Sequence, residues 1–269
     1  MAELTPMMQQ YFEIKNKNKD YILFYRLGDF YEMFFDDAKL VSRELELTLT
    51  GRDCGQGERA PMCGVPYHSA EGYIAKLVQK GYKIAICEQM EDPKKAKGLV
   101  KREIIRRVTP GTVVEASMLD ENRNNFLGCV YAAGGSVGVC FADITTGSVY
   151  ATGSDNWNDI TSEFGRFAPR EVLVGGGAIS ADSLQSFLKE RLEALIEPMP
   201  EECFEAQRSA ERIQEHFKVQ DFDAAGLTDL PCTVQCLGGL LDYLEQTQKV
   251  QPFQSESAAG VPSRPVYGA

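Results

Sequence analysis

Residues 125–154 read NFLGCVYAAGGSVGVCFADITTGSVYATGS and constrain the fold of this chain more than any other stretch. Short apolar runs are separated there by Gly-Gly and Thr-Gly, which predicts two or three antiparallel strands joined by tight turns. Beyond them we expect a helix near 156–166, a strand at 171–174 (EVLV), and helices near 180–193 and 234–248. Strands first, and then strands alternating with helices, predict a mixed α/β domain.

The first 110 residues carry their own signals for helices and strands. Thr5 followed by Pro6 predicts an N-cap and a first helical position, opening a helix to about Asn16. Residues 21–27, YILFYRL, predict a buried strand, and the turn signal Gly28-Asp29 follows it. We expect a helix from about Phe30 to Leu45.

A second helix is expected at 73–79 and a second strand at 82–88. Pro110-Gly111 is the best candidate boundary. The predicted domains are therefore residues 1–113 and 114–250, followed by an irregular tail over 251–269 that has no periodic pattern.

The net charge of −11 argues against wholesale nucleic-acid binding, but the charge is unevenly distributed. Residues 1–110 hold 18 Lys and Arg against 16 Asp and Glu, with a basic cluster at 94–107, whereas residues 111–269 hold 10 against 23. This asymmetry indicates two units with different partners, of which the first tolerates a polyanion better.

Two further features bear on location and metal binding. No apolar run approaches the roughly 20 residues that span a bilayer, and no secretory signal opens the chain, so we expect a cytoplasmic protein with free thiols. Cys54 and Cys63 with His68 could form part of a zinc site. Their spacing matches no standard finger and a fourth ligand is missing, so no metal is expected.

The stretch GDFYEMFF (28–35) raises the question of which aromatic side chains are buried. In the expected helix, one face would carry Tyr31, Phe34, Phe35, Ala38, Val41 and Leu45. Phe30 lies at the edge of that face and Glu32 nearly opposite. Either Phe30 caps the core and Glu32 stabilises the helix dipole, or Phe30 is an exposed wedge that can unstack bases beside a hydrogen-bonding carboxylate. Spacing alone leaves both interpretations open.

A family resemblance rests on three segments: FYRLGDFYEMFFDDAKLVSRELELTLT (24–50), APMCGVPYHSAEGYIAKLVQKGYKIAICEQMEDP (60–93) and REIIRRVTPGT (102–112). They closely resemble the N-terminal mismatch-recognition domain of the bacterial MutS family of DNA mismatch repair proteins, over residues 5–113. Residues 120–248 resemble, more distantly, the connector domain of that family. The resemblance implies an α/β fold with a mixed-sheet first domain and a ribonuclease H-like connector.

The resemblance also implies roles for individual residues. In the Phe-x-Glu signature of the family, Phe30 would stack on a mispaired base from the minor groove and Glu32 would hydrogen-bond that base. Tyr31 and Phe34 would give structural support. DNA backbone or groove contacts are expected, with ordinary solvated surface as the alternative, for Arg52, Met62, Lys76, Arg106 and Arg107.

The implied partners are mismatched double-stranded DNA and, through the connector, the protein MutL. The full-length family forms dimers, whereas we expect this chain to be monomeric in the bacterial cytoplasm, near the nucleoid. ATP and Mg²⁺ belong to the ATPase domain of the family. The chain contains no GxxxxGK[ST] segment, so we expect no cofactor and no enzymatic activity from it.

Two rival functions remain. A ribonuclease H-like unit could be a nuclease if Asp143 clustered with Asp120, Asp155 or Glu171, although an aspartate before Thr-Thr-Gly more often forms a turn. The acidic second unit could instead be a protein-interaction module without DNA binding of its own.

Smaller motifs point to structure. The glycine run 175–177 lacks the Lys-Ser/Thr of a phosphate loop and reads as a turn. Trp157, His216 and the apolar residues of 181–195 are assigned to packing or surface.

Overall fold

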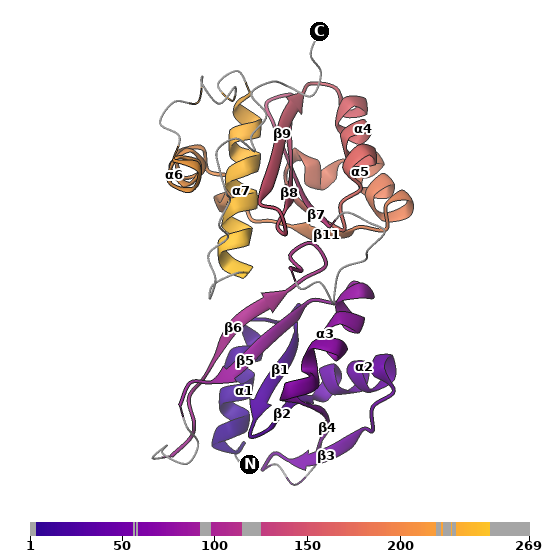
Figure 1. Ribbon diagram of the computed structural model, residues 1–269, viewed down its shortest axis with the longest axis vertical. Helices are drawn as coiled ribbons and strands as arrows, with labels where there is room; N and C mark the ends of the chain where they lie inside the picture. Colours follow the sequence, from indigo (N-terminus) through magenta and orange to yellow (C-terminus); the bar gives the residue numbers. More distant parts are fainter. Residues whose placement is uncertain are drawn as a thin grey trace. The chain divides into compact units, whose positions relative to one another are not determined.

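The computed structural model describes residues 4–55, 57, 59–91, 98–114, 125–218, 222, 227 and 230–247. Among these, the chain divides into two compact units, the first ending at Thr109 and the second beginning at Pro110 (Figure 1). Each unit is built around its own sheet.

The first unit has a six-stranded mixed sheet in the order β3-β4-β2-β1-β5-β6. Its strands are β1 (Ile22–Leu27), β2 (Phe30–Phe34), β3 (Thr50–Asp53), β4 (Arg59–Pro66), β5 (Ile84–Gln89) and β6 (Arg102–Val108). Its helices are α1 (Pro6–Asn16), α2 (Phe35–Leu45) and α3 (Ala70–Gln79). β1 runs parallel to β5, and the other neighbouring pairs are antiparallel. The expected mixed sheet is confirmed.

The hairpin of β1 and β2 shows that the expected helix over residues 30–45 was wrong in its first turn. That helix begins at Phe35, and residues 30–34 pair with β1 on one side and β4 on the other. Gly28, with a φ of +57°, takes the left-handed first position that a two-residue type II′ turn requires. The apolar spacing of 31–45 fits a helix. Pairing with β1 across the turn and with β4, some thirty residues away, gives the strand its backbone hydrogen bonds, and helical periodicity reports neither pairing.

Helices cover both faces of this sheet. On one face Leu23, Tyr25 and Phe34 pack with Met8 and Tyr11 of α1. On the other, the Cys63 thiol of β4 donates a hydrogen bond to the Ala38 carbonyl of α2, at 3.4 Å. Figure 1 shows α2 and α3 together on that second side. We call the sheet face on which α1 packs the α1 face.

The second unit has a five-stranded mixed sheet in the order β11-β10-β7-β8-β9. Its strands are β7 (Phe126–Ala133), β8 (Ser136–Asp143), β9 (Ser148–Ser154), β10 (Glu171–Gly176) and β11 (Leu195–Pro198). β8 is antiparallel to both its neighbours, whereas β10 is parallel to β7 and β11. β7 to β9 form the predicted meander and β10 is the predicted strand, whereas β11 was not predicted. The sheet has the ribonuclease H-like arrangement that the resemblance implied.

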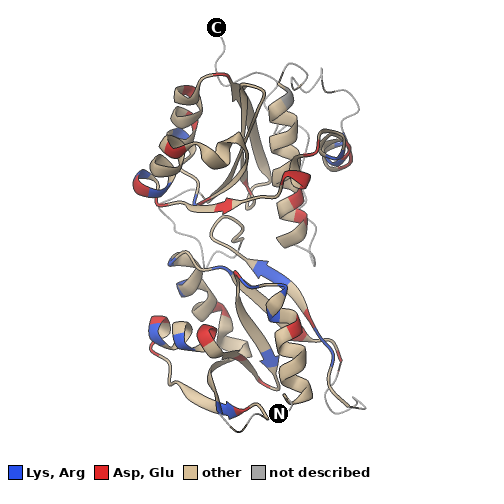
Figure 2. Ribbon diagram, turned by 180° about the vertical axis from the view of Figure 1, so that it is seen from behind, with Lys and Arg blue, Asp and Glu red and all other residues tan. Residues whose placement is uncertain are grey.

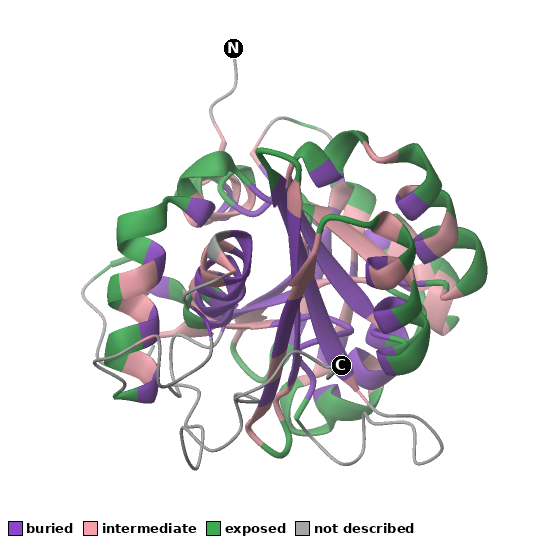
Figure 3. Cartoon of the chain, turned by 90° about the horizontal axis from the view of Figure 1, so that it is seen from above, coloured by how far each residue is buried: buried purple, intermediate pink, exposed green. Residues whose placement is uncertain are grey.

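Helices pack on both faces of the second sheet as well. They are α4 (Trp157–Phe167), α5 (Asp182–Ser186), which continues as a π-helical turn over Phe187–Arg191, α6 (Ala206–Phe217) and α7 (Pro231–Thr247). One core forms under α6 and α7 and another under α4 and α5. Figure 3 shows buried strands between helices whose outer sides are exposed. Of these helices, α6 was not predicted from the sequence. Within the described part of the chain, no helix is long and apolar enough to cross a bilayer.

Candidate nucleic-acid interface

Phe30 and Glu32 lie side by side because they belong to a strand. Side chains two residues apart in a strand point to the same face, whereas the expected helix would have turned these two apart. Both lie on the α1 face, since Phe34 of the same strand packs there. Phe30 leaves 46% of its surface exposed, while Tyr31 on the opposite face is buried. The strand thus pairs an exposed aromatic ring with a neighbouring carboxylate.

A polar network beneath the turn holds this hairpin. The Tyr31 hydroxyl donates to Glu88 Oε1, and Arg26 Nη1 pairs with the same oxygen at 3.1 Å. Arg26 Nε also donates to the Gly28 carbonyl at 2.6 Å. Burial and the Glu88 carboxylate raise the pKa of Tyr31, so its phenol stays protonated and donates even in alkaline solution.

Arg102 extends the network, and it was not among the residues predicted from the sequence. Its Nε donates to the Arg26 carbonyl at 2.8 Å and its Nη1 to Gln10 Oε1 at 3.0 Å, joining β6, β1 and α1. Gln89 Oε1 accepts the Gly28 N–H at 3.2 Å. A buried arginine with several hydrogen-bond acceptors rigidifies its surroundings, so these hydrogen bonds hold the turn that precedes Phe30 in one conformation.

Glu32 itself is paired. Arg52 Nη1 donates to Glu32 Oε2 at 2.6 Å, across β4, which lies between the strands that carry them. The residue opposite Glu32 on β4 is Gly64, where an added Cβ would lie 3.5 Å from Glu32 Cγ. The Arg52 side chain is 41% exposed and that of Glu32 15%.

The other predicted DNA contacts are spread over the unit. Met62 pairs with Phe34 and lies half-buried on the α1 face. Lys76 is exposed on α3, against the opposite face. Arg106 and Arg107 lie half-buried on β6, at the far edge of the sheet from Arg52, and Arg107 Nη2 donates to Asn18 Oδ1 at 2.8 Å.

The structure therefore brings only Arg52 and Met62 of this set close to Phe30 and Glu32. The remaining basic positions lie elsewhere on the strands and helices of the unit (Figure 2). The part of the basic cluster over 94–97 lies outside the described residues.

The carboxylates considered for a nuclease do not converge. Asp143 Oδ1 accepts hydrogen bonds from the Thr145 N–H and hydroxyl, at 2.9 and 2.6 Å, as a turn former does. Asp155 accepts from Ser136, at the other end of β8. Glu171 points to the opposite sheet face from Asp143 and accepts hydrogen bonds from Tyr243 and Gly111. Asp120 lies outside the described residues.

The structure separates the cysteines considered for zinc. Cys54 packs in the core on the α1 face, whereas Cys63 donates toward α2 on the other face, and His68 is exposed. Burial raises the pKa of the Cys63 thiol to about 11, which disfavours the thiolate that zinc requires.

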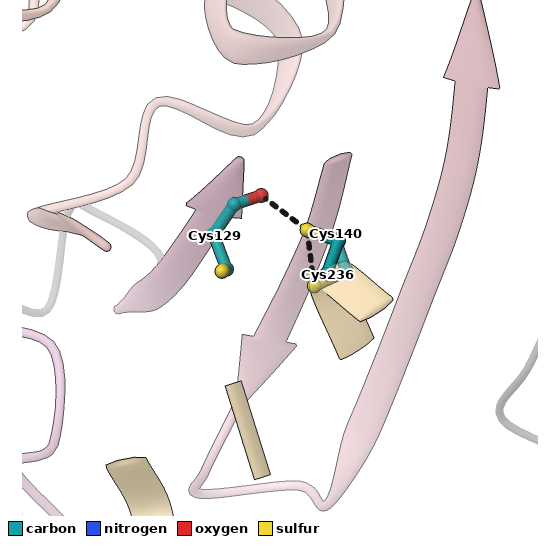
Figure 4. Close-up of side chains that lie close together, drawn as sticks. All are labelled: Cys129, Cys140 and Cys236. Carbon is teal, nitrogen blue, oxygen red and sulfur yellow. Dashed lines mark hydrogen bonds between the residues drawn. The ribbon is translucent and has the colours of Figure 1, made fainter. Parts of the chain in front are cut away.

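A thiol cluster that spacing did not reveal joins β7, β8 and α7 (Figure 4). The sulfur atoms of Cys129, Cys140 and Cys236 lie within 4.8 Å of one another. Cys236 donates to the Cys129 carbonyl at 3.1 Å and lies 3.4 Å from the Cys140 sulfur. All three are fully buried, and burial raises their pKa values well above the usual range, so they are protonated core groups.

The smaller motifs take structural positions. Gly175 lies under the Phe204 ring, where a Cβ would come within 2.1 Å of a ring carbon, so close packing rather than a phosphate explains this glycine. Trp157 packs against the core under α4 and α5, as do the apolar side chains of α5. Burial lowers the pKa of His216, which is half-buried on α6.

Comparison with known proteins assigns both units. Residues 5–117 match the family model of MutS domain I, and residues 125–254 match that of MutS domain II. The chain is 51% identical over 255 residues to the DNA mismatch repair protein MutS of Acetivibrio thermocellus, with 93% of this chain and 29% of the relative covered. The MutS proteins of Lachnoclostridium phytofermentans and Ruminiclostridium cellulolyticum are 51% and 50% identical, with 93% of this chain and 27% and 29% of their lengths covered.

The chain thus spans less than a third of the length of the curated relatives that it matches. The two matched ranges do not overlap, and each range contains one of the two sheets of the structure. The chain belongs to the MutS family, and its two units are MutS domain I and MutS domain II.

Proposed function

We propose that the first unit recognises mismatched base pairs in double-stranded DNA, with Phe30 stacking on a mispaired base from the minor groove and Glu32 hydrogen-bonding that base. The shared face of β2 carries the proposal: the exposed Phe30 ring and the Glu32 carboxylate lie side by side on it, at the Phe-x-Glu spacing of the family. A ring that is 46% exposed at the start of the strand is accessible for stacking on a base.

Stacking energetics favour a mismatch over a matched pair. Stacking one base on an aromatic ring contributes ~1–3 kcal/mol, and unstacking a base step costs a few kcal/mol. In matched duplex the two nearly cancel. A mismatch has already lost pairing energy and bends more readily, so the same ring binds there with a net gain.

Glu32 contributes to selectivity through its charge. A carboxylate near DNA phosphates is repelled, and that repulsion weakens binding wherever no base group satisfies the oxygen atoms. A mispaired base, with donor groups freed from pairing, can satisfy them. Glu32 therefore penalises matched duplex more than mismatched duplex.

Of the predicted contacts, Arg52 lies beside Phe30 and Glu32 and would supply a phosphate contact, with Met62 near it on the α1 face, whereas Lys76, Arg106 and Arg107 lie against the opposite face or at the far edge of the sheet. Because these contacts are few, we expect weak duplex binding that falls steeply with salt. ATP chemistry belongs to domains of the family other than these two, and no step of this proposal uses it.

Titration of matched and single-mismatch duplexes at low salt tests the proposal. Phe30→Ala should abolish the preference for the mismatched duplex. Ile179→Ala is the matched control, because Ile179 is 45% exposed in the second unit and its removal should leave the preference intact. Equal preference in the parent chain and in Phe30→Ala would contradict the wedge.

For the second unit we propose binding of a MutL-like partner protein. Residues 111–269 hold 23 acidic and 10 basic residues, and this net negative charge favours a protein partner over DNA. Co-purification of the whole chain with MutL, compared with Phe30→Ala, tests this proposal. Binding should be retained in the variant, and no detectable complex with the parent chain would contradict it.

A further inference from the structure

The ion pair between Arg52 and Glu32 has a consequence for how a mismatch is read, and this inference rests on the proposed function above. Arg52 was expected to contact the DNA backbone and Glu32 the base. In the structure each holds the other, with Nη1 and Oε2 2.6 Å apart. Each residue therefore has one polar atom engaged by the other rather than by DNA.

We propose that Arg52 is a positioning residue for Glu32 and that a DNA phosphate competes with the carboxylate for its guanidinium group. In the free protein and on matched duplex, Arg52 holds Glu32. At a mismatch, Arg52 transfers to a phosphate and the Glu32 carboxylate turns to the mispaired base.

The geometry lets the pair form and open without disturbing the fold. Gly64 opposite Glu32 and Ala60 opposite Arg52 are small residues on β4, so both side chains can lie across that strand. Ion pairs with a partly exposed partner contribute little to stability, and the Arg52 side chain is 41% exposed. A guanidinium group also matches phosphate in the same forked geometry that it offers a carboxylate.

The burial of Glu32 makes the transfer of Arg52 to a phosphate, which we call the exchange, selective for a mismatch. With Arg52 in place the Glu32 side chain is only 15% exposed, so release of Arg52 removes the donor of a carboxylate that has little contact with water. An unsatisfied, largely buried acceptor is unfavourable, and it needs a new donor. The Watson–Crick donors of a matched base are engaged by its partner base, whereas a mispaired base has such a donor to offer. Release of Arg52 is therefore favourable at a mismatch and unfavourable on matched duplex.

Salt dependence of binding measures the exchange directly. The slope of log K against log salt steepens by about 0.9 for each additional phosphate that a protein neutralises on duplex DNA. The experiment measures this slope on matched and mismatched duplexes for the whole chain and for Arg52→Gln, Glu32→Gln and Arg43→Gln. Arg43→Gln is the control, because it removes the same charge from α2, where the side chain is 72% exposed.

The parent chain and Arg43→Gln should show a slope steeper by about 0.9 on mismatched than on matched duplex. Arg52→Gln should remove this difference because no guanidinium can transfer. Glu32→Gln should remove it as well, because Arg52 is then free on both duplexes. It should also raise affinity for matched duplex by up to about fivefold, the size expected of one exposed charge pair.

Two results would overturn the exchange: equal slopes on both duplexes for the parent chain, or a slope difference that survives in Arg52→Gln. Thermal unfolding of each variant checks that the fold is kept. If the parent chain prefers the mismatch and Phe30→Ala does not, while the slopes are equal, the exchange fails and the wedge stands. If the parent chain shows no preference, both fail.

Discussion

The two sheets follow the same alternation of side chains but are covered to different extents. In the second unit the central strands β7 and β8 are buried almost end to end, because helices cover both faces. In the first unit β2 begins exposed at Phe30 and becomes buried toward Phe34. A strand that is buried along its length can only be packed against, whereas the exposed start of β2 leaves a side chain free to contact a ligand. The exposed aromatic ring at the start of β2 is therefore where the proposed DNA contact would be made.

The sharpest test of this contrast truncates one phenyl ring in each sheet. Phe141 is fully buried, with its ring stacked on Phe167 at 4.2 Å and edge-on to Phe164 at 5.3 Å. Phe141→Ala should cost ~3–5 kcal/mol of unfolding free energy. Phe30→Ala should cost less than ~1 kcal/mol because half of that ring is already in water.

Urea unfolding measures both variants. Trp157, the single tryptophan, lies in the second unit and reports its unfolding by fluorescence, while circular dichroism follows the whole chain. A loss in Phe30→Ala as large as in Phe141→Ala would mean that Phe30 caps the core, the alternative that spacing left open.

What the sequence could predict depends on how local the signal is. Thr5 and Pro6 open α1 as expected, and the Thr5 hydroxyl accepts the Met8 N–H at 3.4 Å. The meander over 126–154 was equally readable, since Gly-Gly and Thr-Gly mark its turns. Such elements are determined by residues within a few positions of one another.

The residues proposed for the site came from the family resemblance, whereas their geometry could not be predicted from the sequence. The family resemblance singled out Phe30 and Glu32, yet helical spacing would have placed them on different sides. The strand depends on pairing with β4, and the Arg52 ion pair joins residues twenty positions apart on either side of that strand. Interactions of this kind arise from the tertiary fold, which no local period encodes.

Replacing a glycine by alanine, which adds one methyl group, should affect stability differently on the covered sheet and on an open surface. A Cβ at Gly138 would lie 2.3 Å from the Cys232 carbonyl oxygen, so α7 packs directly on the β8 backbone. Gly138→Ala should therefore destabilise the chain by ~1–3 kcal/mol. Gly72 in α3 has no atom within 4 Å of such a Cβ, and Gly72→Ala should be neutral or stabilise by up to ~1 kcal/mol. Thermal unfolding compares the two, and equal tolerance would show that α7 does not pack this closely.

Replacing a tyrosine by phenylalanine, which removes one hydroxyl, compares how much a buried hydrogen bond stabilises each unit. Tyr243 donates at 2.6 Å to Glu171, which is fully buried and also accepts the Gly111 N–H at 2.8 Å. Tyr243→Phe should cost ~1–3 kcal/mol, since it leaves a buried carboxylate short of a donor.

Tyr31→Phe is the matched change in the first unit. Glu88 keeps its partner Arg26 there, so the cost should be no more than ~1 kcal/mol. Chemical denaturation of both variants decides the order. A larger loss of unfolding free energy in Tyr31→Phe than in Tyr243→Phe would show that the hydroxyl of Tyr31 contributes more to stability than that of Tyr243.

The smallest expected effect concerns pH and the two histidines. Burial lowers the pKa of His216, so the folded state binds its proton less readily than the unfolded state, whose pKa is near 6.5. Stability should therefore fall as the pH drops below about 6.5, toward the folded pKa of His216. His216→Gln should reduce the difference in melting temperature between pH 7.5 and 5.5, by less than about 3 °C. His68→Gln, at an exposed position of the first unit, controls for the loss of a histidine. If both variants change the pH dependence equally, burial of His216 is not its cause.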